Sequence, residues 1–450
     1  MSNHRRYIPR IFAVGLPLLI SQMSQYLMSL ADTAMVGRLG QTELAGMSIG
    51  ATTSWLLFTF LWPVSVGVQA VAARRVGRNE SGKESPLPLT PVLGAGLLVA
   101  LSIFSIALAF STTLKPLFAR ILSDQSVASE ALSYVQYTRW AALFVGLGAG
   151  VQGIMNSLRK TRGIMVVSVT CNLLNILFNW ILIFGKFGFP RMGLAGAGLS
   201  TMISLAIQVM GFWGLWFFRP SMKPYRLESL KPNFQLVKRI LVLCLPVILQ
   251  NGAAIFIMLV FNTMVENLGV LYLAVTQIIF TLFRINKTVV GGFARGAGIL
   301  VGNALGAHDE DSAKKLVWSQ QAIGLIIGLV VITLVLSIPG ALVRIFTADP
   351  DVVELGKQAL RFMAPFFFIE ICAFSLELIF ISAGWTRYVL MSELSTNLLF
   401  VLGLSFLLVF FTNLGIWGAW IGFAVYQIGH ASILFGGWAS GRWLRVRVEC

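Results

Sequence analysis

An internal duplication is the feature that most constrains how this chain can fold. Residues 16–77 align with residues 245–306 at a constant spacing of 229 positions. The residue pairs that share this spacing include Leu16-Pro17 with Leu245-Pro246, Met35-Val36 with Met264-Val265, Leu39-Gly40 with Leu268-Gly269, and Gly67 with Gly296. Later in the chain, Asn175 pairs with Asn397 at a spacing of 222. The repeat covers nearly the whole chain and predicts two similar halves.

The composition of the 450 residues places both halves in a membrane. Hydrophobic residues make up 57% of the chain and charged residues 12%, whereas a soluble domain has about 25% charged residues. A spanning helix needs about 20 apolar residues. Twelve such stretches occur, near residues 12–37, 44–72, 90–113, 131–157, 163–185, 193–218, 240–265, 270–303, 313–338, 358–383, 389–412 and 415–438. The sequence predicts an all-α integral membrane protein with twelve transmembrane helices in two pseudo-symmetric six-helix bundles.

The distribution of charge predicts the orientation of these spans. A net charge of +16 would suggest a nucleic-acid partner if the protein were soluble. Here 22 of the 34 basic residues lie at the termini and in the connections after even-numbered spans, and nine lie on the opposite side. By the positive-inside rule, both termini are cytoplasmic in a multi-pass protein of the plasma membrane, such as a bacterial inner membrane. The positive charge is therefore explained by the orientation of the spans in the membrane, where the basic residues lie near the lipids of the cytoplasmic side. We expect no nucleic-acid partner.

A polar segment at residues 219–239, with three prolines and six basic residues, separates the halves. We therefore expect an N-terminal lobe at 1–218, a cytoplasmic linker at 219–239 and a C-terminal lobe at 240–450. Six spans per half return the chain to its starting side, so the halves share one orientation. Repeats of this kind are typical of transporters, in which the substrate site lies near the midplane where the halves meet.

The chain lacks the residue patterns of an enzyme or an ATP-driven pump. It contains no G-x-x-x-x-G-K phosphate loop, and its three histidines and four cysteines are dispersed along the sequence. In the expected spans we identify no metal-ligating cluster of His, Asp and Glu, and no nucleophile with a base. We therefore expect no catalytic residues, no metal and no cofactor, and transport driven by an ion gradient.

Asp32 is the lone acidic residue of the first expected span. An ionisable side chain inside a membrane is costly and is treated as functional. The preceding turns place Gln25, Met28 and Ser29 on the same helical face, which predicts that the carboxyl points into a polar cavity. Pro17 removes a backbone hydrogen bond and permits bending, so protonation of Asp32 could change the shape of the helix. The alternative is an aspartate that only hydrogen-bonds to neighbouring helices.

A polar stripe in the fifth expected span could meet this carboxyl. Asn172, Asn175 and Asn179 recur along one face of that span, and Thr201 follows in the next span. Polar residues of this kind could bind the coupling ion or line the cavity. They could equally serve only as hydrogen-bonding contacts between helices.

The second half differs from the first in the charges inside its spans. The eighth span contains Arg284, Lys287 and Arg295, and the tenth carries Glu370 and Glu377 on one face. These side chains could form structural ion pairs, because unpaired charges would be very costly there. Alternatively, they line a cavity in which a base receives an anionic group, or a glutamate receives a cation or proton.

With these features, the chain resembles the multidrug and toxic compound extrusion (MATE) transporters, most closely their DNA-damage-inducible (DinF-like) branch. The matching segments cover nearly the whole chain and are Leu30 to Gly40, Gly67 with Val76-Gly77, Asn172 to Gly185, Gly193 to Thr201, and Leu305-Gly306-Ala307. The resemblance implies the V-shaped pair of six-helix lobes of the MATE/MOP superfamily and alternating access. It also implies efflux of amphiphilic drugs and toxins, such as organic cations, in exchange for H+ or Na+, and a part in antibiotic resistance.

The resemblance also assigns roles to residues of the first half. Pro17 and Asp32 match the family's bending proline and coupling acid, and Asn175 and Thr201 look like its polar partners. With Asn179, these residues form the predicted ion-coupling site.

One departure from the family bears on the coupling ion. Some relatives carry an acid where this chain has Asn179, and others carry a glutamate where it has Gly298. A Na+ site prefers several oxygen ligands with compensating charge, whereas a single carboxylate can carry a proton alone. We therefore predict an H+-coupled antiporter.

Three alternatives stay open. The chain could use Na+, or export organic anions with the basic residues of the eighth span. It could also be a flippase for lipid-linked precursors, whereas a membrane enzyme or receptor lacks support in the residues. Glycines that permit close helix packing do so within a single chain, and we expect a monomer.

Overall fold

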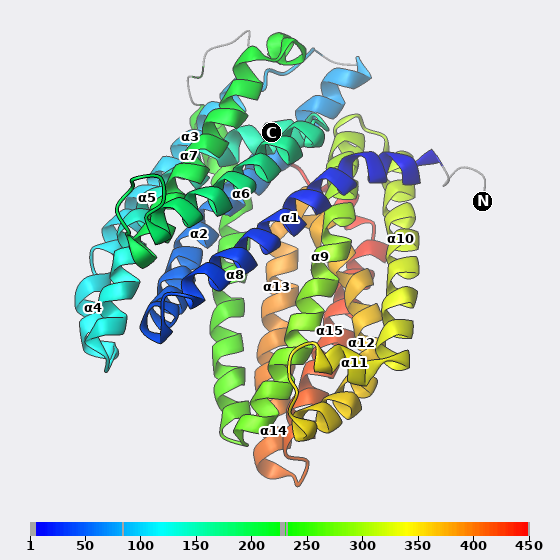
Figure 1. Ribbon diagram of the computed structural model, residues 1–450. Helices are drawn as coiled ribbons and strands as arrows, with labels where there is room; N and C mark the ends of the chain where they lie inside the picture. Colours follow the sequence, from blue (N-terminus) through cyan, green and yellow to red (C-terminus); the bar gives the residue numbers. More distant parts are fainter. Residues whose placement is uncertain (1–5, 83–84, 226–229, 231–232, 449–450) are drawn as a thin grey trace. The chain divides into compact units, whose positions relative to one another are not determined.

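The computed structural model describes residues 6–82, 85–225, 230 and 233–448. Within these residues the regular structure is helical throughout, which confirms the predicted fold class (Figure 1). The long helices of the first half are α1 (Ile8–Gly37), α2 (Gln41–Ser81), α3 (Thr90–Ser111), α5 (Gln125–Ser157), α6 (Thr161–Phe184) and α7 (Gly193–Phe218). Those of the second half are α8 (Phe234–Glu266), α9 (Val270–Gly306), α10 (Glu310–Ser337), α12 (Pro350–Ser382), the passage Thr386–Phe411 and α15 (Ile416–Ala439).

Eleven helices in the described ranges are long and apolar enough to cross a membrane. The fourth expected span lies in the remaining long helix, α5, whose first half is polar and contains Tyr134, Gln136, Thr138 and Arg139. This helix packs against α2, α3 and α7, which bury much of its length. Each of the twelve predicted spans thus corresponds to one long helical passage.

Short helices add detail that the sequence did not predict. The third long helix of each half is followed by a short one, α4 (Leu114–Ile121) in the first half and α11 (Pro339–Arg344) in the second. Two 3-10 turns, Pro220–Tyr225 and Arg442–Arg445, follow α7 and α15. The short helices repeat at corresponding positions, as expected for a duplicated chain.

The eleventh span departs from the regular helix expected at 389–412. It consists of α13 (Thr386–Thr396), a π-helical segment (Asn397–Leu404) and α14 (Ser405–Phe411). Ser405 Oγ donates to the carbonyl oxygen of Phe400 five residues earlier, at 3.3 Å, and to that of Ala419 in α15, at 3.2 Å. Long π segments are rare and are frequently found at functional sites.

The described chain forms two compact units. One unit is Ile20–Leu245, and the other joins the described part of Met1–Leu19 to Pro246–Val448. The division differs from the expected lobes 1–218 and 240–450, because the first helix of each half, α1 or α8, contributes its opening segment to the unit of the other half. The two crossover points lie next to the repeat-paired prolines Pro17 and Pro246.

Glycines explain why the opening segments of α1 and α8 each pack in the unit of the other half. A Cβ on Gly296 of α9 would lie 2.7 Å from the backbone nitrogen of Gly15 and 3.2 Å from the carbonyl oxygen of Ile11, both in α1. In the other unit, a Cβ on Gly67 of α2 would lie 3.0 Å from the carbonyl oxygen of Ile240 in α8. Ile11 and Ile240 share the repeat spacing of Gly67 and Gly296. The same close helix contact therefore occurs once in each unit, with the partner helices exchanged.

Candidate functional site

Asp32 lies in the second part of α1, with only 8% of the residue exposed. The Nδ2 atom of Asn179, a fully buried residue of α6, donates a hydrogen bond of 2.5 Å to its Oδ1 atom. Both residues belong to the unit Ile20–Leu245. The structure thus brings the lone acid of the first span to the asparagine stripe of the fifth. In the described part of the chain, this carboxyl makes no ion pair with a basic side chain.

The contacts of Asp32 continue along α6 and into α7. Asn179 Nδ2 also donates to Asn175 Oδ1 at 3.2 Å, and Asn175 Nδ2 donates to Ser200 Oγ at 3.3 Å. The Oδ1 atom of Asn179 is buried and has no hydrogen-bond partner among the described residues. A chain of amides and a hydroxyl therefore leads away from the carboxyl, and Asn179 keeps one acceptor unused.

Thr201 lies beside this chain of contacts. Its hydroxyl donates to the carbonyl oxygen of Ala197 at 3.0 Å. The Thr201 hydroxyl also contacts the buried side chain of Tyr134 in α5, and Tyr134 is close enough to Asp32 to interact with it. Sequence reasoning named Thr201 and missed Tyr134 and Ser200. Tyr134 lies in the polar first half of α5, a feature that could have drawn attention to it.

Other predicted residues of α1 lie apart from the carboxyl. Asn172 Nδ2 of α6 donates to Ser24 Oγ of α1 at 2.7 Å. Ser24 precedes Asp32 by about two turns of α1, so this contact between the two helices is separate from the one at Asp32. Gln25 and Ser29 are exposed and Met28 is partly buried. The carboxyl of Asp32 contacts Asn179 of α6 and not these three side chains, so a cavity lined by Gln25, Met28 and Ser29 stays a prediction.

In the other unit, Lys287 of α9 forms an ion pair with Glu370 of α12, with 3.3 Å between Nζ and Oε1. Asn286 Nδ2 donates to Oε2 of this glutamate at 3.2 Å, and Gln427 Nε2 of α15 donates to Oε1 at 3.5 Å. Arg284 is exposed and Arg295 is partly buried. The predicted structural ion pair therefore forms at Lys287.

Lys287→Met should destabilise the protein because it leaves Glu370 buried without its positive partner. The lysine side chain is 39% exposed, so we expect a loss of about 1–3 kcal/mol, less than for a fully buried pair. The double variant Lys287→Met/Glu370→Gln should recover most of the loss, and Lys315→Met, which removes the exposed pair with Asp311, should cost about 0.5 kcal/mol or less. Thermal unfolding of the purified variants measures all three. Equal losses for Lys287→Met and Lys315→Met would contradict a structural role for the buried pair.

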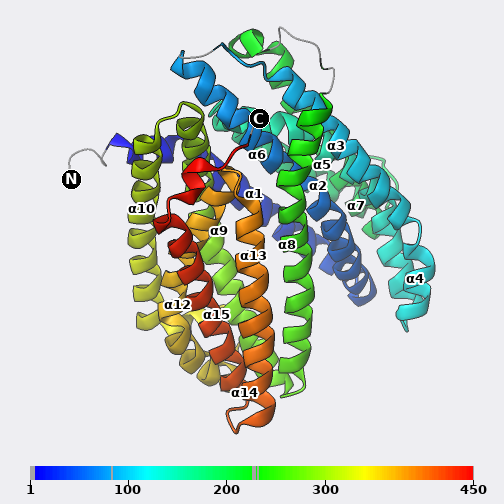
Figure 2. The same ribbon diagram turned by 180° about the vertical axis from the view of Figure 1, so that it is seen from behind.

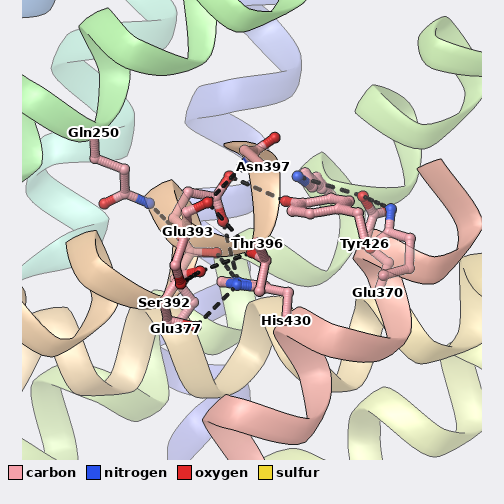
Figure 3. A network of polar contacts seen from close by, with 12 residues as sticks. Gln250, Glu370, Glu377, Ser392, Glu393, Thr396, Asn397, Tyr426 and His430 are labelled. Carbon is pink, nitrogen blue, oxygen red and sulfur yellow. Dashed lines mark hydrogen bonds and ion pairs between the residues drawn. The ribbon is translucent and has the colours of Figure 1, made fainter. Parts of the chain in front are cut away.

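Glu377 joins a second set of polar side chains (Figure 3). Gln250 Nε2 of α8 donates to its Oε1 atom at 2.7 Å, and its Oε2 atom lies 3.7 Å from His430 Nε2 of α15. His430 Nε2 also lies 3.2 Å from Oε2 of Glu393 in α13. The expectation that the spans hold no cluster of His, Asp and Glu is therefore wrong. The three residues come from three helices, so no spacing along the sequence could show the cluster.

Gly298 is the position at which the family resemblance would place a glutamate. A Cβ there would lie 2.7 Å from Ser382 Cβ and 3.2 Å from the carbonyl oxygen of Leu378 in α12. An acidic side chain would not fit at this contact unless α12 moved.

Comparisons with known proteins agree with this architecture. The MatE family model matches residues 17–181 and 246–407. A probable multidrug resistance protein NorM of Photorhabdus laumondii is 24% identical, with 96% of this chain and 95% of the relative covered. Another of the same name, from Thermotoga maritima, is 23% identical over 98% of this chain and 96% of the relative.

Solved structures show the same fold. One, described as the outward-facing conformation of a multidrug resistance MATE family transporter of the MOP superfamily, has a TM-score of 0.86 at 21% identity and covers 98% of this chain and 97% of its own. A second, described as MATE in the bent conformation, has a TM-score of 0.85 at 20% identity with the same coverage.

The duplicated set of six helices and the buried polar groups inside it define a multi-pass membrane transporter. The chain belongs to the MatE family, whose model matches most of its length in two corresponding segments. Proteins of this family are transporters and not enzymes. The prediction of the family is confirmed, and the DinF-like branch stays a prediction.

Proposed function

We propose that this protein is a secondary antiporter that exports amphiphilic organic compounds, cationic drugs and toxins among them, in exchange for H+, with Asp32 as the coupling carboxyl. The observation that carries the proposal is the burial of Asp32 against the amide of Asn179 without a basic partner in the described residues. An ionised carboxylate in such a place is costly, and binding a proton removes that cost. The names of the NorM relatives support drug-like substrates.

The groups around Asp32 support H+ over Na+. A Na+ site needs several oxygen ligands with compensating charge, but both neighbouring asparagines direct their Nδ2 atoms along the chain of contacts. Donor groups of this kind stabilise a carboxylate and repel a cation. We infer that a proton on Asp32 lets the carboxyl donate to the unused Oδ1 atom of Asn179, whereas the ionised carboxylate accepts from Nδ2 of the same residue.

The division of α1 supports a link between this proton and helix shape. Pro17 lies inside α1, two residues before the point at which the helix leaves one unit and enters the other. Proline lacks the N–H that would close the helical turn, so bending there is less costly than elsewhere. We infer that α1 bends at Pro17 during alternating access. The cytoplasmic location of both termini in the plasma membrane belongs to the same proposal.

Transport by the wild-type protein in proteoliposomes tests the function. Efflux of ethidium would be followed under an imposed pH gradient without Na+, and then under a Na+ gradient at equal pH. We expect dye transport and accompanying proton movement only under the pH gradient. Dye transport that requires Na+ would replace H+ as the coupling ion, transport of organic anions alone would change the substrate class, and lipid scrambling without solute transport would favour the flippase.

Pro17→Ala should reduce H+-driven dye efflux roughly tenfold while the protein stays folded, because hinge residues affect turnover without touching the substrate. Pro365→Ala is the matched control, since Pro365 also lies inside a helix, α12, but far along the chain from either crossover point. Initial efflux rates in proteoliposomes with equal protein content measure the effect. Equal rates for the two variants would exclude Pro17 as the bending point.

A further inference from the structure

The cluster formed by Glu377, Glu393 and His430 has no role in the proposed proton exchange at Asp32. The residues come from α12, α13 and α15, which lie side by side in the unit that contains Pro246–Val448 (Figure 2). One ligand atom of each of the three residues lies within 4.8 Å of the others, and His430 Nε2 lies 3.7 Å from Glu377 Oε2 and 3.2 Å from Glu393 Oε2. Figure 3 shows the three side chains converging from these helices.

Hydrogen bonds hold the outer atom of each of these side chains. Gln250 donates to Glu377 Oε1 at 2.7 Å, the Tyr426 hydroxyl donates to Glu393 Oε1 at 3.0 Å, and Ser392 Oγ contacts His430 Nδ1 at 3.1 Å. Partners on the outer atoms orient ligands in metal sites in this way. Each side chain is therefore held so that its second oxygen or nitrogen atom faces the other two side chains.

Two of the inner atoms have no hydrogen bond. His430 is 3% exposed, and its Nε2 atom has no hydrogen-bond partner among the described residues, nor has Glu393 Oε2, although the two atoms lie only 3.2 Å apart. Leaving buried polar atoms unbonded is costly, and a bound group between them would remove that cost. An imidazole nitrogen with two carboxylate oxygens is a ligand set that suits transition metals.

The distances and charges also fit a small dication. Around Zn²⁺, bonds of about 2.0–2.2 Å in a tetrahedral arrangement separate neighbouring ligand atoms by roughly 3.3–3.6 Å. The observed separations of 3.2 and 3.7 Å from His430 Nε2 to the two carboxylates fall on either side of that range. Lys287 is close enough to act on both glutamates, but it is already paired with Glu370, so the cluster keeps an excess of negative charge.

We propose that Glu377, Glu393 and His430 bind one divalent first-row transition-metal ion, of the class of Zn²⁺, Co²⁺ and Mn²⁺, with solvent completing its coordination. The ion connects α12, α13 and α15 immediately before the π-helical segment Asn397–Leu404. The histidine ligand favours this class over Mg²⁺ and Ca²⁺, which prefer oxygen atoms alone. The site is independent of Asp32, which lies in the other unit.

Titration of the full-length, chelator-treated protein in detergent with Co²⁺ tests the proposal, because ligand-field absorption reports the ion and its geometry. We expect one Co²⁺ per chain, displaced by Zn²⁺, and binding at least about tenfold weaker in Glu393→Gln and in His430→Gln. The matched controls are Glu310→Gln and His308→Gln, both at exposed positions, and Asp32→Asn; all three should bind as the wild type does.

Ser392→Ala keeps every ligand and removes only the contact with His430 Nδ1, so it tests the site if the ligand variants do not fold. Loss of an outer partner weakens metal binding by about 10–100-fold, and we expect a change in that range. Absence of stoichiometric Co²⁺ binding by the wild type would overturn the proposal. Unchanged binding in folded His430→Gln or Ser392→Ala, or loss of binding in His308→Gln, would overturn it as well.

Discussion

Asp32→Asn should abolish H+-driven export while leaving the protein folded. The substitution keeps the size of the side chain and still accepts the hydrogen bond from Asn179, but it removes the group that can carry a proton. We expect the initial rate of dye efflux under a pH gradient to fall at least about a hundredfold, since loss of the coupling carboxyl leaves no path for the driving force. Efflux and proton uptake measured together in proteoliposomes give the result.

The matched control is Glu310→Gln, which makes the same chemical change at an exposed position at the start of α10. Its efflux should equal that of the wild type. Retained coupling in Asp32→Asn would move the ion site to the other unit, where Glu370 and Glu377 are the buried acids. The Co²⁺ titration tests the metal site separately from proton coupling at Asp32, because Asp32 is not among the proposed ligands.

Gly296→Leu should prevent stable folding of the unit that contains Pro246–Val448. A side chain at this position would meet backbone atoms of Gly15 at 2.7 and 2.8 Å, and backbone cannot move aside as a flexible side chain can. Overpacking of a tight contact costs about 1–3 kcal/mol and sometimes more, and we expect the upper end or above here. The yield of monodisperse protein on size exclusion and the midpoint of thermal unfolding should both fall sharply.

Gly436→Leu serves as the comparison because a Cβ on this glycine of α15 meets nothing within 4 Å. It makes the same substitution in a helix of the same unit without a steric conflict, and its unfolding midpoint should lie close to that of the wild type. Similar midpoints for Gly296→Leu and Gly436→Leu would mean that α1 does not depend on this contact with α9.

The helices, and the helix face that meets Asp32, could be predicted from the sequence because their signals are local. Each span is a continuous apolar run, and Asp32 and the asparagines stand out as polar residues inside such runs. A helical spacing places Asn172, Asn175 and Asn179 on one face, so a contact of that face with Asp32 was a reasonable expectation. Which amide reaches the carboxyl depends on how α1 and α6 cross, and only the structure shows that it is Asn179.

Features that depend on three or more helices could not be predicted in this way. Glu377, Glu393 and His430 lie on three different helices, and the sequence shows Glu377 only as a partner of Glu370 on the face of its own span. The π-helical segment Asn397–Leu404 has an ordinary apolar sequence, and its geometry depends on the backbone of α15. The sequence also does not predict the exchange of the opening segments of α1 and α8. The repeat would look the same whether each opening segment packed on the glycines of its own half or on those of the other half.

This exchange has a consequence for how the protein is synthesised and how it arose. During translation, residues 20–245 can complete their unit once α8 begins, but the opening of α1 must wait for α9 before it finds its glycine partners. A half-length ancestor with the same exchanged contacts would have paired with a second copy, each giving the opening segment of its first helix to the other. The gene fusion would then have turned a swapped dimer into a single polypeptide, with the crossovers retained beside Pro17 and Pro246.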